Sequence, residues 1–327
     1  MTRRTTTILA SLAALLAAAM PADAGAATHQ ATHQDSLNWA GYAASKPGVR
    51  FRRVASTWVQ PAASCAAGER RYSAYWVGLG GFHSTSKALE QIGSQVDCSS
   101  TGQAFYSAWY ELVPAASMPI HLAVHPGDTL SASVTVSHGK VKLYLANRTR
   151  GTHFAKQLRP KQLDVTAADW IVEAPSACDD NGCHTLPLAN FGSASFTGAT
   201  ATTTDGHAGP IADPAWSSTA LALAPAAVGS FDATIGFGSS SAGATPSDLS
   251  PSGDGFTVTY NDGTAPAPAP ETPVPTAPVP TAPVPAAPAA PVGPPPPVGQ
   301  APAPIAPLPG PTGQVPSPLG QRAALAP

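Results

Sequence analysis

The sequence has 327 residues, of which 11% are charged, and its formal net charge is −2. This charge offers no basic surface for nucleic acid, so nucleic-acid binding is not expected. All four cysteines and all six tryptophans lie between Trp39 and Trp216, whereas most of the 37 prolines follow residue 263. The chain is therefore expected to contain one folded domain and a separate tail.

The first 24 residues predict an export signal. Arg3 and Arg4 precede an apolar run from Ile8 to Met20, and Ala22-Asp23-Ala24 offers a small-x-small cleavage site. The run is shorter than the roughly 20 residues of a membrane span, so an uncleaved anchor is the weaker alternative. We expect a secreted protein with no membrane span and a short lead-in over residues 25–37.

Residues 38–262 predict an all-β domain. The β-branched and aromatic segments 54–59 and 105–112 each end before a proline. Residues 129–136 and 141–146 flank a His-Gly turn and alternate apolar with polar side chains, which is typical of a hairpin with one buried face.

Further strands are expected at residues 169–173, 193–204 and 256–260. Short strands between Gly, Pro, Asn and Asp turns favour a two-sheet antiparallel β-sandwich of the concanavalin-like kind. The alanine-rich segment 219–228 is the one place where a short helix is expected, although Pro225 interrupts it.

Residues 263–327 repeat Ala-Pro and Pro-Val-Pro units with almost no charge or aromatic side chains. Such a segment cannot bury enough apolar surface to offset its ordering entropy, so a disordered Pro-rich tail is predicted. A dedicated ligand for a proline-binding partner is the alternative.

Four cysteines in an exported chain predict two disulfides. Cys178 and Cys183 bracket the turn-forming sequence Asp-Asp-Asn-Gly, which leaves Cys65 with Cys98. A zinc site is the alternative, but the paired Cys-x-x-Cys spacing of such sites is missing.

Familiar catalytic patterns are absent from the sequence. It has neither the His-Glu-x-x-His of zinc proteases nor the Gly-x-Ser-x-Gly of serine hydrolases. His121 and His125 would share a strand face, but no third metal ligand is evident, and neither a metal nor a cofactor is expected. The remaining candidates are Glu173 at the end of an apolar strand and Gln91 beside Gly93. Structural roles for both are the alternative.

These candidates belong to five segments with a common resemblance. In chain order the segments are Asn38-Trp39-Ala40-Gly41-Tyr42, Trp76-Val77-Gly78-Leu79-Gly80-Gly81, Gln91-Ile92-Gly93, Ala108-Trp109-Tyr110-Glu111 and Ala168-Asp169-Trp170-Ile171-Val172-Glu173. They resemble, in the same order, segments of the glutamic peptidases (eqolisins). The likeness extends from Asn38 to about Tyr260, and the family fold is a sandwich of two antiparallel sheets.

The resemblance implies roles for individual residues. Glu173 and Gln91 match the catalytic Glu and Gln of the family. Trp39, Trp76 and Trp109 are expected to line the substrate cleft, and Glu111 to support it; core packing is the alternative for each tryptophan. Gly80 and Ser107 replace family aspartates, and extra residues before Asp97 leave Gln95 open as an alternative to Gln91.

The function implied is that of an acid endopeptidase that cleaves proteins or peptides as a monomer. The Glu carboxylate would activate a water, and the Gln amide would stabilise the oxyanion. An acidic optimum follows if Glu173 keeps a pKa near 4.3. The alternatives are a secreted carbohydrate- or cell-wall-binding sandwich without catalysis, and a glycosidase that uses Glu111 with Glu173.

Overall fold

The structure is a computed structural model that describes residues 31–179, 182–224 and 242–263. The predicted export signal and nearly all of the predicted Pro-rich tail lie outside these ranges. No helix among the described residues is long and apolar enough to cross a membrane.

The described residues form 18 β-strands and no α-helix, which confirms the all-β prediction. The strands are β1 (Thr32–Ser36), β2 (Trp39–Ser45), β3 (Phe51–Val59), β4 (Arg71–Gly80), β5 (Leu89–Cys98), β6 (Ala104–Val113), β7 (Met118–Ile120), β8 (Thr129–Ser137), β9 (Lys140–Asn147), β10 (Thr152–Leu158), β11 (Ala167–Glu173), β12 (Ser176–Asp179), β13 (Gly182–Thr185), β14 (Ser193–Thr203), β15 (Ala208–Pro210), β16 (Ser217–Leu223), β17 (Gly243–Pro246) and β18 (Phe256–Asn261).

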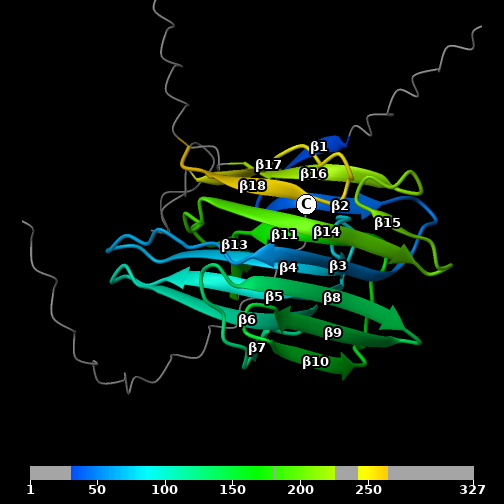
Figure 1. Ribbon diagram of the computed structural model, residues 1–327, viewed down its shortest axis with the longest axis horizontal. Coiled ribbons are helices and arrows are strands. Elements are labelled where there is room, and N and C mark those ends of the chain that lie inside the picture. Colours follow the sequence, from blue (N-terminus) through cyan, green and yellow to red (C-terminus); the bar gives the residue numbers. More distant parts are fainter. Residues whose placement is uncertain (1–30, 180–181, 225–241, 264–327) are drawn as a thin grey trace, which may run out of the picture. The chain divides into compact units, whose positions relative to one another are not determined.

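The main strands follow one hydrogen-bonded path that folds into two layers (Figure 1). One layer has the order β10-β9-β8-β3-β14-β18, and the other has the order β16-β2-β11-β4-β5-β6-β7. The short strand β17 pairs with both β18 and β16 and so joins the layers at one corner. Neighbouring strands are antiparallel except β1, which pairs in parallel with β16. The predicted β-sandwich is confirmed.

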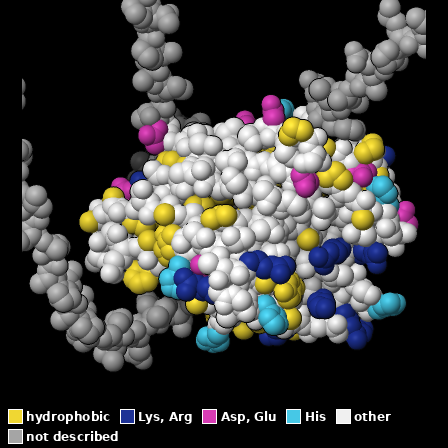
Figure 2. All heavy atoms as spheres, viewed as in Figure 1, with side chains coloured by type: hydrophobic (Ala, Val, Ile, Leu, Met, Phe, Trp, Pro, Cys, Tyr) yellow, Lys and Arg dark blue, Asp and Glu magenta, His cyan; other side chains and the backbone are white. Residues whose placement is uncertain are grey.

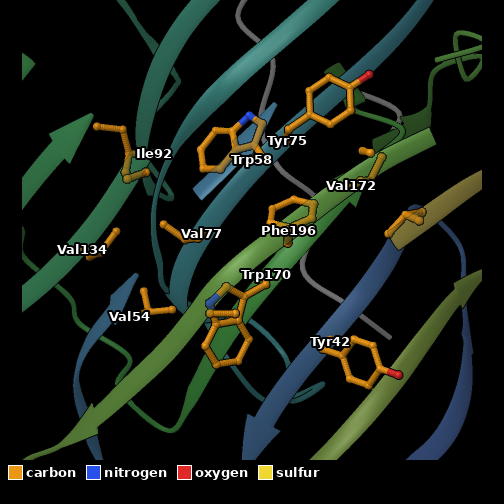
Figure 3. Packing of buried hydrophobic residues seen from close by; sticks show 14 of the residues in the cluster. Tyr42, Val54, Trp58, Tyr75, Val77, Ile92, Val134, Trp170, Val172 and Phe196 are labelled. Atoms are coloured by element: carbon orange, nitrogen blue, oxygen red, sulfur yellow. The ribbon is translucent and has the colours of Figure 1, made fainter. Parts of the chain in front are cut away.

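The main core lies between the two layers and is rich in aromatic residues (Figure 3). Trp58 and Phe196 lie with ring centroids 5.7 Å apart. The indole N–H of Trp170 on β11 donates to the carbonyl of Ala55 on β3 at 3.0 Å, and that of Trp58 on β3 donates to Ser94 Oγ on β5 at 3.1 Å. These two bonds satisfy buried donors and tie one layer to the other.

The strands expected from the sequence lie within β3, β6, β8, β9, β11, β14 and β18. The expected helix at 219–228 is wrong over its described part, because Ser217–Leu223 is strand β16. This strand pairs with β2 and β1, so its backbone groups are satisfied by neighbours. The intrinsic preference of alanine for helix is weak beside such tertiary pairing. Residues 225–228 lie outside the described residues.

The predicted Cys65–Cys98 disulfide is present and links the loop before β4 to the end of β5. The register of β12 with β13 sets Cys178 opposite Cys183, and Cys183 is disulfide-bonded. The side chain of Cys178 lies outside the described residues.

Lys and Arg side chains gather over β8, β9 and β10 on the face shown in Figure 2. These strands belong to the layer that lies across the core from β4, β5 and β11. The cations are therefore separated by the core from the outer face of the second layer, where the candidate residues lie.

Candidate active site

Alternate residues of β16, β2, β11, β4, β5 and β6 point away from the main core and form a second buried cluster on the outer face of their layer. Its members are Trp39, Ala43, Ala74, Trp76, Leu89, Trp109, Ile171 and Leu221, with Phe82 and Val113 at its margin. The strand register orders this face into rows, each with one residue per strand. We call it the outer face.

Glu173 stands in the first row, between Trp39 on β2 and Ala74 on β4. Its carboxylate is only 2% exposed. The indole N–H of Trp76 donates to Oε2 at 2.8 Å, and Asn38 Nδ2 donates to Oε1 at 3.2 Å. Both oxygens are thus held by donors, which fixes the position of this side chain.

Burial raises the pKa of Glu173 to about 8, and the hydrogen bond from Trp76 opposes this rise. The nearby carboxylate of Glu111 raises the pKa further, and the donor on Asn38 lowers it. The indole N–H of Trp39 also lowers it, although that N–H makes no hydrogen bond of ordinary geometry. The free protein therefore holds a proton on Glu173 below about pH 8.

The second row is built around tryptophan and glycine. Trp76 pairs with Ile171 on β11 and with Gly93 on β5, and Gly93 pairs with Trp109 on β6. A Cβ added at Gly93 would lie 2.1 Å from the carbonyl oxygen of Tyr75 and 2.6 Å from Cβ of Trp76. Only glycine therefore leaves room for Trp76 to reach Glu173.

The third row contains Asp169, Gly78, Gln91 and Glu111. Gln91 is fully buried at the third position of β5, and its Nε2 donates to Glu111 Oε2 at 2.8 Å. Its Oε1 is buried without a hydrogen-bond partner. The carboxylate of Asp169 is also fully buried, and neither of its oxygens has a hydrogen-bond partner.

The outer face brings the predicted residues together. Glu111 connects them, because it accepts the amide of Gln91 and also acts electrostatically on Glu173. Trp39 and Trp76 meet edge to face with ring centroids 5.0 Å apart. Trp109 belongs to the same cluster, and its buried Nε1 has no hydrogen-bond partner. Trp39 and Trp76 therefore lie beside the candidate carboxylate, and Trp109 packs in the same cluster.

Gln95, the alternative to Gln91, lies in the same row as Glu173 with Ala74 between them. It is 6% exposed, and its Nε2 donates to Asp97 Oδ2 at 2.9 Å. Gln91 instead pairs with Glu111, the one side chain of these rows whose charge acts on Glu173. This link favours Gln91 as the amide that works with Glu173.

Sequence reasoning missed two supporting residues. Asn38 lies within the Asn-Trp-x-Gly motif, but no sequence pattern predicts its bond to Glu173. Ser36 Oγ accepts the backbone N–H of Trp39 at 3.1 Å and fixes the turn that presents Asn38. The Asn-Trp-x-Gly motif was the available signal for Asn38, whereas a serine just before it carries no comparable signal.

Two buried carboxyls lie near the start of β5: Asp169 is on the outer face and Glu90 is on the opposite side of the sheet. Glu90 and Asp169 both have raised pKa values because of burial, and the charge of Asp164 contributes to each. Among the described residues, no group of three or more His, Cys, Asp or Glu side chains has a geometry that could hold a metal ion.

The Peptidase A4 family matches residues 37–220, a range that contains the three rows from Asn38 to Glu173. The chain belongs to this family. Aspergillopepsin-2 of Aspergillus niger is 28% identical over 250 residues, which are 69% of this chain and 78% of that protein. The relationship makes the chain a glutamic-type peptidase, as the sequence motifs predicted.

Solved structures agree with this membership. Scytalido-glutamic peptidase with a transition-state analog inhibitor is 25% identical and superposes with a TM-score of 0.54, over 69% of this chain and 98% of that chain. SCP-B, an eqolisin in complex with the tripeptide Ala-Ile-His, is 24% identical with a TM-score of 0.51 over the same shares and supports the fold alone.

Proposed function

We propose that this peptidase is an exported endopeptidase in which Glu173 activates a water and Gln91 stabilises the oxyanion. The water attacks the scissile carbonyl as Glu173 takes up its proton, and Glu173 then delivers that proton to the leaving amine. The carbon–nitrogen bond breaks, and an acid and an amine are released.

One observation carries this proposal. Glu173 is a buried carboxylate held by two donors, and the charge that acts on it belongs to the partner of Gln91. A buried carboxylic acid that has a raised pKa and is held by two hydrogen-bond donors is typical of catalytic acid–base groups, since a solvated surface glutamate needs none of these supports.

The amide of Gln91 suits the stabilising role. One Nε2 hydrogen is bonded to Glu111, which orients the group and leaves its second hydrogen for a developing oxyanion. Removal of one such donor costs about 2.7–4 kcal/mol in other enzymes. Because strand β5 holds Gln91 rigidly, little reorganisation is needed when charge develops.

The protonation of Glu173 bears on the pH optimum. Water activation needs the ionised carboxylate, whereas burial keeps the free protein protonated below about pH 8. The acid optimum expected from the sequence stays a prediction, and burial raises the pKa of Glu173 above that of an ordinary carboxyl in the substrate-free protein. We expect kcat/KM to rise with pH along a limb controlled by Glu173.

Export is supported by the Cys65–Cys98 disulfide, because such bonds persist mainly in oxidising compartments. The monomeric state stays a prediction from the sequence.

Cleavage of an unfolded protein across pH 2 to 9, with EDTA present, tests the catalytic role. We expect Glu173→Gln to lower kcat/KM by roughly 10⁴-fold, at the upper end for acid–base catalysts. The matched control is Glu69→Gln, which alters an exposed glutamate paired with Arg71 and is expected to leave activity intact. Retained activity in a folded Glu173→Gln variant would remove Glu173 from the mechanism.

A non-catalytic binding sandwich would give a different result. It would bind a ligand but cut no peptide at any pH, and the rate would not depend on Glu173. The glycosidase alternative requires Glu111 to act as the second carboxylate, whereas its bond to Gln91 already occupies Oε2.

A further inference from the structure

The two layers of the sandwich differ in the sign of their charge. The strands of the first layer, β10-β9-β8-β3-β14-β18, contain no Asp or Glu. Their cations are Arg52, Arg53, Lys140, Lys142 and Lys156. The carboxyls in the strands of the second layer are Glu90, Asp97, Glu111, Asp169 and Glu173. The net charge of −2 does not reveal this separation, because charges of opposite sign lie in different layers.

Cations gather on the side of the first layer that points away from the core, which we call the basic face (Figure 2). The strand register sets Arg53 on β3, Thr135 on β8 and Lys142 on β9 in one row across this face. Because adjacent strands lie about 4.8 Å apart, the Cα atoms of the two cations are about 10 Å apart. Lys140 lies on the same face of β9, two residues before Lys142.

Arg159 adds a fourth cation at this end of the basic face. A Cβ added at Gly139, in the turn between β8 and β9, would lie 3.9 Å from a guanidinium nitrogen of Arg159. Lys140 directly follows that glycine, so Arg159 and Lys140 lie near each other. Like charges held close together repel, and an anion bound between them relieves this repulsion.

No carboxylate of the protein neutralises these four cations. Arg53, Lys140, Lys142 and Arg159 are all exposed, and none takes part in an ion pair within the described ranges. Arg53 Nη1 donates to the neutral hydroxyl of Thr135 at 3.2 Å. A group of unpaired cations without nearby carboxylates produces a local positive potential that attracts polyanions.

Hydroxyl side chains lie beside these cations on the basic face. The register places them outward on β3, β8 and β14, and none of them is fully buried: Thr57, Ser131, Thr135, Thr197, Thr200 and Thr202. Each hydroxyl can donate one hydrogen bond and accept others. The basic face therefore combines cations with the groups that hydrogen-bond to sugar hydroxyls.

A membrane and a nucleic acid fit the basic face less well. Membrane-binding surfaces add exposed apolar side chains to their cations. Among the described residues, Val59 is the only large, exposed apolar side chain in this layer, and it lies at the opposite end of β3 from Arg53. Single-stranded nucleic acids stack on exposed rings. The outward ring of Tyr144 on β9 is half-buried and already stacked on His153, with centroids 5.9 Å apart.

We propose that the basic face binds an acidic polysaccharide whose uronate carboxylates pair with Arg53, Lys140, Lys142 and Arg159. A uronate polymer repeats a carboxylate along its chain and keeps ring hydroxyls for the Ser and Thr side chains. A sulfated polymer instead carries its charge on those hydroxyl positions. Because the core separates the basic face from Glu173, the bound polymer leaves the outer face open. The inference does not depend on the peptidase function.

Titration calorimetry of the full chain with polygalacturonate at pH 6 tests this binding, and neutral dextran is the blank. In about 20 mM salt we expect polygalacturonate to bind and dextran not to bind. Raising the salt to about 200 mM should increase Kd at least about tenfold, because pairing of several cations with a polyanion releases counterions.

Three other polyanions are titrated in parallel: dextran sulfate, single-stranded DNA, and vesicles of phosphatidylcholine with phosphatidylglycerol. We expect each to bind more weakly per charge than polygalacturonate. Tighter binding of any one of them would overturn the assignment to a uronate polymer.

Combining Arg53→Gln, Lys140→Gln and Lys142→Gln should weaken polygalacturonate binding at least about tenfold in about 100 mM salt. Thr57→Val with Thr135→Val keeps the β-branched shape but removes two hydroxyls, and should weaken binding about threefold. Melting curves check that each variant folds.

The matched control combines Lys46→Gln, Arg70→Gln and Lys87→Gln. It removes the same charge from exposed residues that lie outside the strands of the first layer. In about 100 mM salt, charges more than about 10 Å apart are largely screened, so Kd should stay within about twofold of wild type. Equal weakening by the two triple variants would mean that net charge, and not the basic face, governs binding.

Two further results would overturn the inference. One is the absence of polygalacturonate binding in about 20 mM salt. The other is competition between the polymer and a small neutral peptide substrate, which would place the polymer over Glu173 instead of on the basic face. If the chain cleaves no peptide, the catalytic proposal fails, whereas the titrations still decide whether the basic face binds the polymer.

Discussion

The two faces of strand β11 are both buried, yet they have different contents. Trp170 and Val172 point into the main core, where the Trp170 N–H is satisfied by a backbone carbonyl. Ile171 and Glu173 point to the outer face, where carboxyls and amides remain incompletely bonded. The Trp170 side of β11 satisfies its indole donor and stabilises the fold. The other keeps unsatisfied polar groups in a dry environment, as functional sites do.

A change of pH should act most strongly through the buried carboxyls of this layer, which lie on both of its faces. Burial raises the pKa values of Glu173, Glu90 and Asp169 in the folded chain. A carboxyl with a raised folded pKa stabilises the fold below its unfolded pKa, and this contribution is lost as pH rises through the folded value. The melting temperature should therefore fall between about pH 5 and pH 9, by more than any single substitution below.

Glu90→Gln should flatten this decline in melting temperature, because burial raises the pKa of Glu90 to about 9 and the substitution removes this titratable group. Asp128 and Asp164 have lowered pKa values, since hydrogen bonds outweigh their burial, so their contribution is lost in acid instead. Calorimetric scans every half pH unit would measure how the melting temperature changes with pH, both in acid and between pH 5 and pH 9. A melting temperature that stays constant from pH 5 to 9 would contradict the prediction.

Truncation of a buried side chain in the main core should lower the free energy of unfolding. Trp170→Ala removes a fully buried side chain together with its bond between the layers, and should cost about 3–5 kcal/mol of unfolding free energy. Leu37→Ala, at a 73% exposed position, should stay within about 0.5 kcal/mol of wild type. Urea denaturation at pH 5 measures both. Similar losses in the two variants would mean that the interior is not close-packed around Trp170.

Substitutions on the outer face should lower peptidase activity. Gln91→Ala should lower kcat/KM by roughly 10²- to 10³-fold, the effect of losing one oxyanion donor. Gln95→Ala should cost less in rate, because Gln95 donates to Asp97 and has no link to Glu111. Steady-state kinetics on one fluorogenic peptide compares them. A larger loss of kcat/KM in Gln95→Ala than in Gln91→Ala would show that Gln95 is the catalytic amide, since Gln95 shares a row with Glu173.

The smallest expected effect concerns one N–H group. Trp76→Phe keeps a ring on the outer face but removes the donor to Glu173, which disfavours the ionised carboxylate. The pKa that governs the rising limb of kcat/KM against pH should increase by about one unit, equivalent to about 1.4 kcal/mol.

Trp170→Phe is the matched control on the opposite face. It also loses an indole donor and should lower stability without moving the pH profile. A shift in Trp170→Phe, or none in Trp76→Phe, would show that Trp76 does not set the proton affinity of Glu173.

The sequence predicted most strands because their side chains alternate or are β-branched, and it predicted Glu173 and Gln91 through motifs in a fixed order. It could not predict strand β16, because its alanines favour helix until β1 and β2 are in place. Nor could it predict that Gln91 meets Glu111, since the two are 20 residues apart and meet only through the register of β5 with β6. The raised pKa of Glu173 likewise depends on burial that no local pattern encodes.

The short strand β1 ends at Ser36, which holds Trp39 and the turn that carries Asn38 to Glu173. The site thus depends on a strand at the very beginning of the folded unit. A peptidase is exposed to its own activity, and a cut inside β1 would detach this anchor. Shortening the chain past Ser36 would remove the acceptor of the Trp39 N–H and disturb the turn that presents Asn38 to Glu173. β1 therefore sets the point beyond which the described domain cannot be shortened without loss of a support of the site.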